Sequence, residues 1–362
     1  ELHSNLPHPQ NSFIVPPGIY LASHSVGAVT LRGQDYLTNR FIAPWTDKGG
    51  EGWENWLGLI DEFSGALAGL LGGDPQDFCP QQNLSSGLTK YLTSLPAPGA
   101  RNKIIMHADA FPSMGFVAAA LGTRGYTLEL IPSQLPAVDP AVWKDAIDDQ
   151  TACALITHVH SNTGALSPVS EIIKLSRKAG VRPLVDIAQS AGIIPIDLDA
   201  WNADAVFGSC VKWLCGGPGA GFMWVNPDHI EELSPEDVGW FSHENPFEFD
   251  INNFRYTKTA KRFWGGTPNV APYALALGGI ETIAAASVQT IRAHNIALMQ
   301  TVHPDVDPDT NGGTLCLPVN DDVTENLRAA GCQFDRRGNI ARLSFHIYNT
   351  PEEAQRITGI VR

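Results

Sequence analysis

Residues 183–225 decide the fold, and they read PLVDIAQSAGIIPIDLDAWNADAVFGSCVKWLCGGPGAGFMWV. The first apolar run of this stretch ends on an acid, Asp186, and a second strand-like run, residues 203–208, is followed closely by Lys212. A glycine-rich turn, residues 216–221, then leads into a further apolar strand. One acid and one lysine therefore lie just past the ends of two buried strands. In open α/β sheets, ligands bind in the crevice beyond the carboxyl ends of the strands.

Asp186 and Lys212 are the two kinds of group that pyridoxal phosphate needs from a protein. A carboxylate holds the ring nitrogen and a lysine forms a Schiff base. Lys212 is the one charge in the apolar and small-residue run 208–216, where desolvation lowers a lysine pKa toward the nucleophilic range. From spacing alone, an ordinary surface lysine remains the alternative. The glycines do not indicate a nucleotide loop, because they lead into a strand and no Gly-Lys-Ser/Thr follows.

The composition narrows the class of protein. A chain of 362 residues with 43% hydrophobic residues can bury a large core and suggests two domains. The net charge of −14 argues against nucleic acid and anionic membrane as partners. The six cysteines are scattered and form no C-x-x-C pair, and no apolar run approaches the roughly 20 residues of a membrane span. With no signal pattern at the start of the chain, we expect a cytoplasmic protein.

Strands alternate with helices over much of the chain. The pattern predicts strands at 103–106, 126–131 and 152–159, and helices at 114–121, 142–147 and 170–179. Such alternation is typical of βαβ units and a mostly parallel sheet. Residues 272–301 form one long helical pattern, and residues 302–362 read as a smaller α+β unit.

Two other kinds of site find little support. His158 and His160 alternate on one strand face, but no third ligand has supporting spacing, so we favour core or pocket-edge histidines and expect no metal. The chain has no G-x-S-x-G elbow, which makes a serine hydrolase improbable.

Several motifs resemble one enzyme family. VDIAQSAG and VFGSCVKWLCGGPGAGFMWV resemble the cofactor segment of fold-type I pyridoxal-phosphate enzymes of the class V aminotransferase superfamily, and kynureninases most of all. Five further motifs follow the kynureninase order: IYLASHSVG, AFPS, GWFSHENPFEF, RFWGGTPNV and ARLSFHIYNT. The resemblance implies the fold of these transferases, an α/β large domain with a mostly parallel, seven-stranded sheet flanked by helices. The large domain would span residues 46–271, and the N-terminal arm (1–45) and a small α+β C-terminal domain (272–362) complete the chain.

The resemblance also assigns roles to residues. Lys212 would carry the cofactor covalently, Asp186 would hold its ring nitrogen, Gln189 its phenolic oxygen, and Phe111 would stack on the ring. The remaining predicted cofactor contacts are Leu84 through its backbone, Ser85, Thr163, Ser209, Trp240 and Thr267. Arg342 would take the substrate α-carboxylate in a two-pronged salt bridge, which suits the planar fork of arginine. Ser25, His24 and His243, with Trp240, would line the substrate side. Trp240 and Thr267 can come from the partner subunit in this family, so a homodimer is implied.

The motifs also depart from the kynureninase pattern. Val211 and Met114 stand where kynureninases carry tyrosine and aspartate, and Gln189 and His24 stand where they carry histidine and asparagine. We expect an enzyme that acts on a small amino acid, with kynureninase-like Cβ–Cγ hydrolysis as the leading reaction. The alternatives are transamination, epimerisation, C–S lysis or desulfuration with Cys332 as the available thiol, and an inactive homologue that only binds a ligand.

Overall fold

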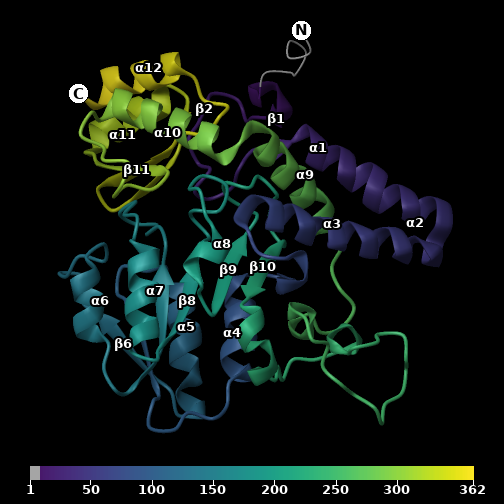
Figure 1. Cartoon of the computed structure of the whole chain (residues 1–362). Coiled ribbons are helices and arrows are strands. Elements are labelled where there is room, and N and C mark those ends of the chain that lie inside the picture. Colours follow the sequence, from purple (N-terminus) through teal and green to yellow (C-terminus); the bar gives the residue numbers. More distant parts are fainter. Residues whose placement is uncertain (1–8) are drawn as a thin grey trace.

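A seven-stranded sheet forms the centre of the molecule, as Figure 1 shows for the computed structural model, which describes residues 9–362. Residues 1–8 of the predicted N-terminal arm lie outside this described part. The strands follow the order β4 (Phe78–Gln81), β10 (Gly221–Val225), β9 (Ala205–Ser209), β8 (Arg182–Asp186), β7 (Thr151–Thr157), β5 (Lys103–His107) and β6 (Thr127–Ile131). Only β10 runs antiparallel to its neighbours among these strands. The expected α/β fold with a mostly parallel sheet is confirmed.

Buried apolar runs form the central strands, and helices cover the sheet. In β8 the side chains of Pro183, Leu184 and Val185 are all buried, as expected for a strand covered on both faces. The covering helices are α4 (Leu84–Ser94), α5 (Pro112–Ala120), α6 (Pro140–Ala146), α7 (Val169–Lys178) and α8 (Leu198–Trp201). Helix α7 ends just before Gly180, whose φ of 70° is a backbone conformation that glycine adopts at low cost.

The N-terminal segment runs along one side of the sheet and into an arm of helices (Figure 1). Its elements are β1 (Phe13–Ile14), β2 (Ile19–Tyr20), β3 (Val29–Thr30), α1 (Leu31–Tyr36), α2 (Ala43–Lys48) and α3 (Trp53–Leu71). Between β2 and β3 the chain passes directly over the backbone of residues 211–215. There the Gly27 N–H donates to the Val211 carbonyl at 2.9 Å. A Cβ on Gly27 would lie 2.1 Å from the Lys212 carbonyl oxygen, so this crossing requires glycine.

The prediction of a single long helix over residues 272–301 is wrong in one respect. The segment forms two helices, α9 (Ala271–Ala286) and α10 (Val288–Val302), which are bent by 76°. Ser287 lies between them with a φ of 68°, and its hydroxyl accepts from the Thr290 N–H as the cap of α10. Over residues 9–362, no single helix is long and apolar enough to cross a membrane; only this bent pair passes that test when its two helices are taken together.

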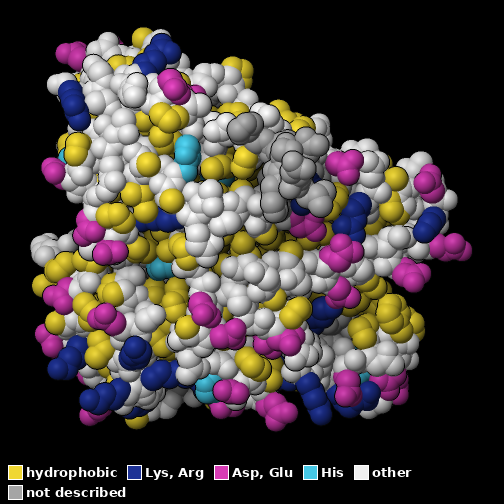
Figure 2. Space-filling view, turned by 45° about the horizontal axis from the view of Figure 1, so that its top comes forward, with side chains coloured by type: hydrophobic (Ala, Val, Ile, Leu, Met, Phe, Trp, Pro, Cys, Tyr) yellow, Lys and Arg dark blue, Asp and Glu magenta, His cyan; other side chains and the backbone are white. Residues whose placement is uncertain are grey.

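A second lobe follows α10. It contains β11 (Thr314–Pro318), α11 (Asp321–Ala329), β12 (Cys332–Gln333), β13 (Asp335–Arg337), β14 (Ile340–Ser344) and α12 (Pro351–Val361). The lobe has its own hydrophobic cluster, to which Ile19 and Leu21 contribute from the N-terminal segment, while most of α9 packs in the large cluster around the sheet. The division at residue 272 stays a prediction. Figure 2 shows basic and hydrophobic side chains along the boundary between this lobe and the rest of the molecule.

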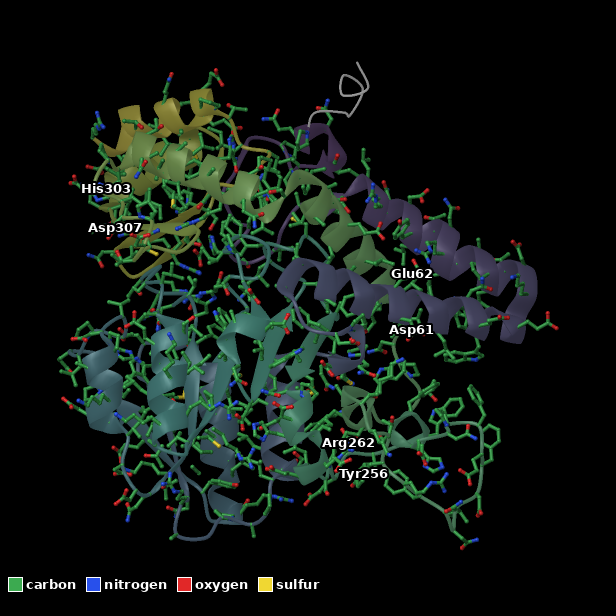
Figure 3. The ribbon with its side chains drawn as sticks, viewed as in Figure 1. Asp61, Glu62, Tyr256, Arg262, His303 and Asp307 are labelled. Atoms are coloured by element: carbon green, nitrogen blue, oxygen red, sulfur yellow. The ribbon has the colours of Figure 1, made fainter. Side chains whose placement is uncertain are left out.

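Residues 231–267 form a loop-rich segment that extends away from the sheet (Figure 1). An ion pair of 2.6 Å between Lys261 Nζ and Asp61 Oδ1 ties its end to α3, and the Arg262 guanidinium lies 5.6 Å from the Tyr256 ring centre. Figure 3 labels Asp61, Tyr256 and Arg262. The base of the segment is therefore fixed, while its tip projects.

Candidate active site

A cavity of about 180 Å³ lies at the carboxyl ends of β7, β8 and β9. Its lining brings together the following residues: Asn83, Leu84, Ser85, Phe111, Ser113, Met114, Thr157, Val159, Ser161, Asp186, Ala188, Gln189, Ser209, Val211 and Lys212. The stretch 186–212 thus contributes its acid and its lysine to the same cavity. The topology explains why: β8 and β9 are adjacent and parallel, with Asp186 opposite Phe207, so the segments after both strands leave at one edge.

The electrostatics of the cavity set the protonation of its lysine. Burial lowers the pKa of Lys212; the Asp186 carboxylate opposes this, and the charges of Arg342 and Arg337 lower the pKa further. Burial also raises the pKa of Asp186, although the Ala188 N–H and Lys212 act in the opposite direction. The Ala188 N–H donates to Asp186 Oδ1 at 2.8 Å. A lysine with a lowered pKa beside a buried carboxylate is suited to forming a Schiff base.

One wall of the cavity is the first turn of α4. Asn83 caps the helix, accepting at Oδ1 from the Ser86 N–H at 2.9 Å, and Leu84 and Ser85 follow at the first helical positions. The first N–H groups of a helix have no partner within the helix and favour anions. The helix begins at Leu84, which places Ser85 in this first turn. This turn and the Ser209 hydroxyl could hold a phosphate group.

The other walls fit the ring of pyridoxal phosphate. The Phe111 ring centre lies 5.8 Å from Lys212 Nζ and faces the same cavity. Gln189 donates from Nε2 to the His24 carbonyl at 3.0 Å, while its buried Oε1 has no partner among residues 9–362. An unpaired buried acceptor is costly, so a donor on a bound group is the expected partner. The lysine, the carboxylate, the aromatic face and the helix start thus match the chemistry of this cofactor.

Other predicted residues lie outside this cavity. Thr163 is exposed, and its hydroxyl accepts from the Ala165 N–H at 3.2 Å. Thr267 lines a separate hollow of about 160 Å³ together with Trp264. Trp240 and His243 lie in the projecting segment, where His243 Nε2 donates to Glu248 at 2.9 Å.

The predicted substrate residues His24 and Arg342 meet at a third residue that the sequence analysis missed. Asp335 accepts from His24 Nε2 at 2.9 Å and from Arg342 Nη1 at 2.8 Å. Burial would raise the pKa of Asp335, but the hydrogen bond from His24 and the charge of Arg342 outweigh burial and hold the pKa at about 2. Ser25, next to His24, is exposed to solvent.

Arg337 and Ser161 were also missed. Arg337 Nη1 donates to the Ser161 hydroxyl, which lines the cavity, at 3.2 Å. The pairing of Asp335 in β13 with Arg342 in β14 brings these groups together. Charged residues in a short hairpin are a weak sequence signal of a binding site, because the register of the strands decides whether their side chains face it.

The predicted metal candidates are buried structural histidines. His158 Nδ1 lies 2.8 Å from the Ser190 hydroxyl, and burial lowers the pKa of His158 to about 3. His160 packs edge-on against His107, with 5.6 Å between the ring centres. Over the described part of the chain, no group of three His, Cys, Asp or Glu side chains could hold a metal ion.

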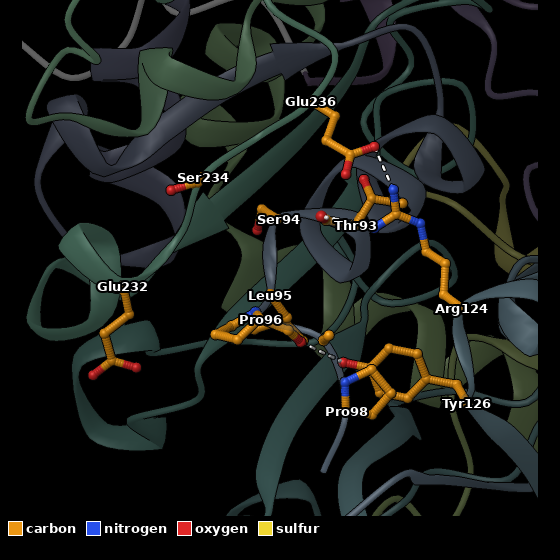
Figure 4. Close-up of a pocket in the computed structure, with 11 residues that line it drawn as sticks. Thr93, Ser94, Leu95, Pro96, Pro98, Arg124, Tyr126, Glu232, Ser234 and Glu236 are labelled. Carbon is orange, nitrogen blue, oxygen red and sulfur yellow. Dashed lines mark hydrogen bonds and ion pairs between the residues drawn. The ribbon is translucent and has the colours of Figure 1, made fainter.

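A larger hollow of about 510 Å³ lies near the amino-terminal ends of the strands (Figure 4). Residues 93–98, 124–126 and 232–236 contribute to its lining. Arg124 binds Glu236 there, and the Tyr126 hydroxyl donates to the Pro96 carbonyl at 3.5 Å. Glu232, which also lines the hollow, pairs with Arg182 at 2.6 Å. The charged groups of this hollow are therefore already paired.

Comparisons with known proteins agree with this geometry. The family model for class-V aminotransferases matches residues 88–318. A kynureninase from Burkholderia mallei (strain SAVP1) is 30% identical over 301 residues, which cover 80% of this chain and 71% of that protein. A kynureninase from Pseudomonas fluorescens is 29% identical over 310 residues, with the same coverage.

Solved structures share the fold at low sequence identity. The cystine C-S lyase C-DES, in complex with its product cysteine persulfide, is 19% identical with a TM-score of 0.85, and the match covers 95% of this chain and 97% of that one. A variant of C-DES carries glycine covalently linked to its pyridoxal-phosphate cofactor; it is 19% identical, with a TM-score of 0.84 and coverage of 95% and 96%. A cysteine desulfurase from Thermococcus onnurineus NA1 is 18% identical, with a TM-score of 0.82 and coverage of 99% and 98%.

Proposed function

The chain belongs to the class-V aminotransferase family and is a pyridoxal-phosphate-dependent enzyme, and on that premise we propose that it cleaves a small amino acid by a kynureninase-like hydrolysis. The observation that carries the site is the cavity at the ends of β7, β8 and β9, where Lys212 and Asp186 face the same space. The curated kynureninases at about 30% identity support the reaction type.

Different residues around the cavity would bind different parts of the cofactor. Lys212 would hold the cofactor through Nζ, and the Asp186 carboxylate would hold its ring nitrogen. Phe111 would stack on the ring, and the first turn of α4, with Leu84 and Ser85, would bind the phosphate. Pyridoxal phosphate supplies, when bound, an electron sink for bonds at the substrate α-carbon.

Lys212 would also act as a general base. Burial lowers the pKa of its amine, which would accept and return a proton at the substrate α-carbon. Arg342, in the second lobe, orients the substrate through its α-carboxylate.

Substrate tests separate the reactions. The purified holoenzyme is incubated separately with kynurenine, 3-hydroxykynurenine, cysteine, and alanine plus a keto acid, and the products are identified by mass spectrometry. Turnover of kynurenine or its hydroxy derivative to alanine supports the hydrolase. If only alanine with the keto acid turns over, the proposed hydrolysis is wrong and transamination is favoured.

Desulfuration through Cys332 has little support. Its thiol is buried, and burial raises its pKa to about 11. Cys332 lies in β12, which pairs with β2, and packs in the hydrophobic cluster of the second lobe. A persulfide-forming cysteine needs an accessible thiolate. C–S lysis that uses no enzyme thiol remains the second candidate, and the fold shared with C-DES motivates including cysteine in the assay.

We propose further that the enzyme is a cytoplasmic homodimer. Four side chains at the tip of the projecting segment are exposed, with Ile251 at 94% and Phe249 at 76%: Phe247, Phe249, Ile251 and Phe254. An apolar patch of this kind is typical of an interface. A second copy seated on it would bring Trp240 and Thr267 to the other active site. Ile251→Glu should produce monomers in analytical ultracentrifugation, whereas Phe116→Glu, an exposed control on α5, should not; a monomeric wild type would contradict the proposal.

A further inference from the structure

Arg342 is the predicted substrate-binding arginine, and one edge of its guanidinium already pairs with a carboxylate of this chain. Arg342 is 1% exposed and pairs across the β13–β14 hairpin with Asp335, which accepts from its Nη1 at 2.8 Å. The same carboxylate also binds His24. An incoming carboxylate therefore finds Arg342 partly neutralised. Its Nε, however, is buried with no partner within residues 9–362, so one donor still lacks an acceptor.

Arg337 is a second guanidinium at the same place. It lies on β13 two residues after Asp335, and its Nη1 reaches across from the second lobe to the Ser161 hydroxyl at 3.2 Å. Ser161 lines the cavity that contains Lys212. The approach of Arg337 Nε to Asp335 Oδ2, at 3.9 Å, is too long for a hydrogen bond. The remaining donors of Arg337 are thus available at the cavity mouth.

The charges of this cluster leave one positive charge in excess. Arg337 and Arg342 are positive and Asp335 is negative, while burial lowers the pKa of His24 and favours its neutral form. Burial lowers the pKa of Lys212, and the charges of both arginines lower it further. A single carboxylate would balance the cluster. Arginine pairs bind carboxylates with directed, charge-assisted hydrogen bonds.

We propose that Arg337 is a second substrate-binding residue, which holds the α-carboxylate of the amino acid together with the free edge of Arg342. This inference rests on the proposed function, because it requires a substrate whose amine reaches the cofactor on Lys212. The inference also explains the contact with Ser161. The Ser161 hydroxyl holds the Arg337 guanidinium at the cavity mouth until a substrate carboxylate binds.

Binding of two amines to the holoenzyme tests the proposal. L-alanine and ethylamine both carry an amine, but only L-alanine has a carboxylate, and both dissociation constants follow from the absorbance change of the bound cofactor. In Arg337→Ala we expect the Kd of L-alanine to rise about 10- to 100-fold, as for loss of a charged hydrogen bond. The Kd of ethylamine should stay within about twofold, because no carboxylate contact is lost.

Two controls separate the charge from the contact between lobes. Ser161→Ala removes the same hydrogen bond but keeps the guanidinium, so the Kd of L-alanine should change less than about threefold. Arg337→Lys keeps the charge and should recover part of the affinity. An unchanged Kd in Arg337→Ala, or an equal loss in Ser161→Ala, overturns the assignment of Arg337. A wild type whose spectrum responds to no amino acid at all contradicts the proposed function itself, and this inference with it.

Discussion

Replacing Gly27 by alanine should loosen the contact that fixes the backbone of Lys212. An added Cβ would lie 2.1 Å from the Lys212 carbonyl oxygen, 2.7 Å from Cys215 Sγ and 3.0 Å from Cys215 Cα. These neighbours are mostly backbone, so they can yield only if the loop after β9 moves. Overpacking of this kind costs about 1–3 kcal/mol. The Gly27–Val211 hydrogen bond of 2.9 Å would also be strained, at about 0.5–1.5 kcal/mol.

A total of about 3 kcal/mol predicts a measurable fall in Tm. The unfolding entropy of a chain of this length is about 0.8 kcal/mol/K, so the Tm should fall by about 4 °C in differential scanning calorimetry. Gly58→Ala is the matched control. It makes the same change within α3, where an added Cβ meets no atom of the described residues within 4 Å. Because alanine is the better helix former, this variant should gain about 0.5–1 kcal/mol.

The two glycine variants should also differ at the active site. Gly27→Ala displaces the Lys212 backbone relative to Asp186, so its affinity for pyridoxal phosphate should fall, whereas Gly58→Ala should bind the cofactor as the wild type does. A Gly27→Ala protein with wild-type Tm and wild-type cofactor affinity would refute the close approach described here. A fall in Tm of the same size in both variants would refute it as well.

Four further changes test the site and its charges. Lys212→Ala should abolish the absorbance band of covalently held cofactor, measured after dialysis. Asp186→Asn should weaken cofactor binding about 10- to 100-fold in a fluorescence titration, since a charged hydrogen bond is lost. Asp335→Asn should tighten L-alanine binding about fivefold, because Arg342 loses a competing partner worth ~1 kcal/mol; weaker binding would mean that Asp335 only orients Arg342. Burial raises the pKa of Asp77 to about 6. The folded state therefore keeps a proton that the unfolded chain releases, and stability falls as pH rises from about 4 to 6. Asp77→Asn should then stabilise the protein by about 1–3 kcal/mol at pH 7.5 in urea unfolding but leave it unchanged at pH 4.

The cofactor half of the site could be predicted from the sequence because it depends on strand ends. Asp186 and Lys212 follow two apolar runs, and parallel neighbouring strands bring such positions to one edge whatever the rest of the chain does. The break at Ser287 could not be predicted, because the helical pattern continues through it and a single residue with positive φ leaves no trace in the periodicity. Trp240 lies outside the cavity because its position depends on a segment that the sheet does not fix.

The substrate half depends on contacts between segments far apart in the chain. His24 arrives from the crossing over residues 211–215, Arg342 and Asp335 from a hairpin in the second lobe, and Ser161 from the loop after β7. No short motif contains such a cluster, since its formation depends on register and on how the lobes pack. With the roles proposed for these residues, cofactor binding and substrate choice depend on separate parts of the fold. We therefore expect changes in the 335–342 hairpin to alter substrate preference while Asp186 and Lys212 keep the cofactor.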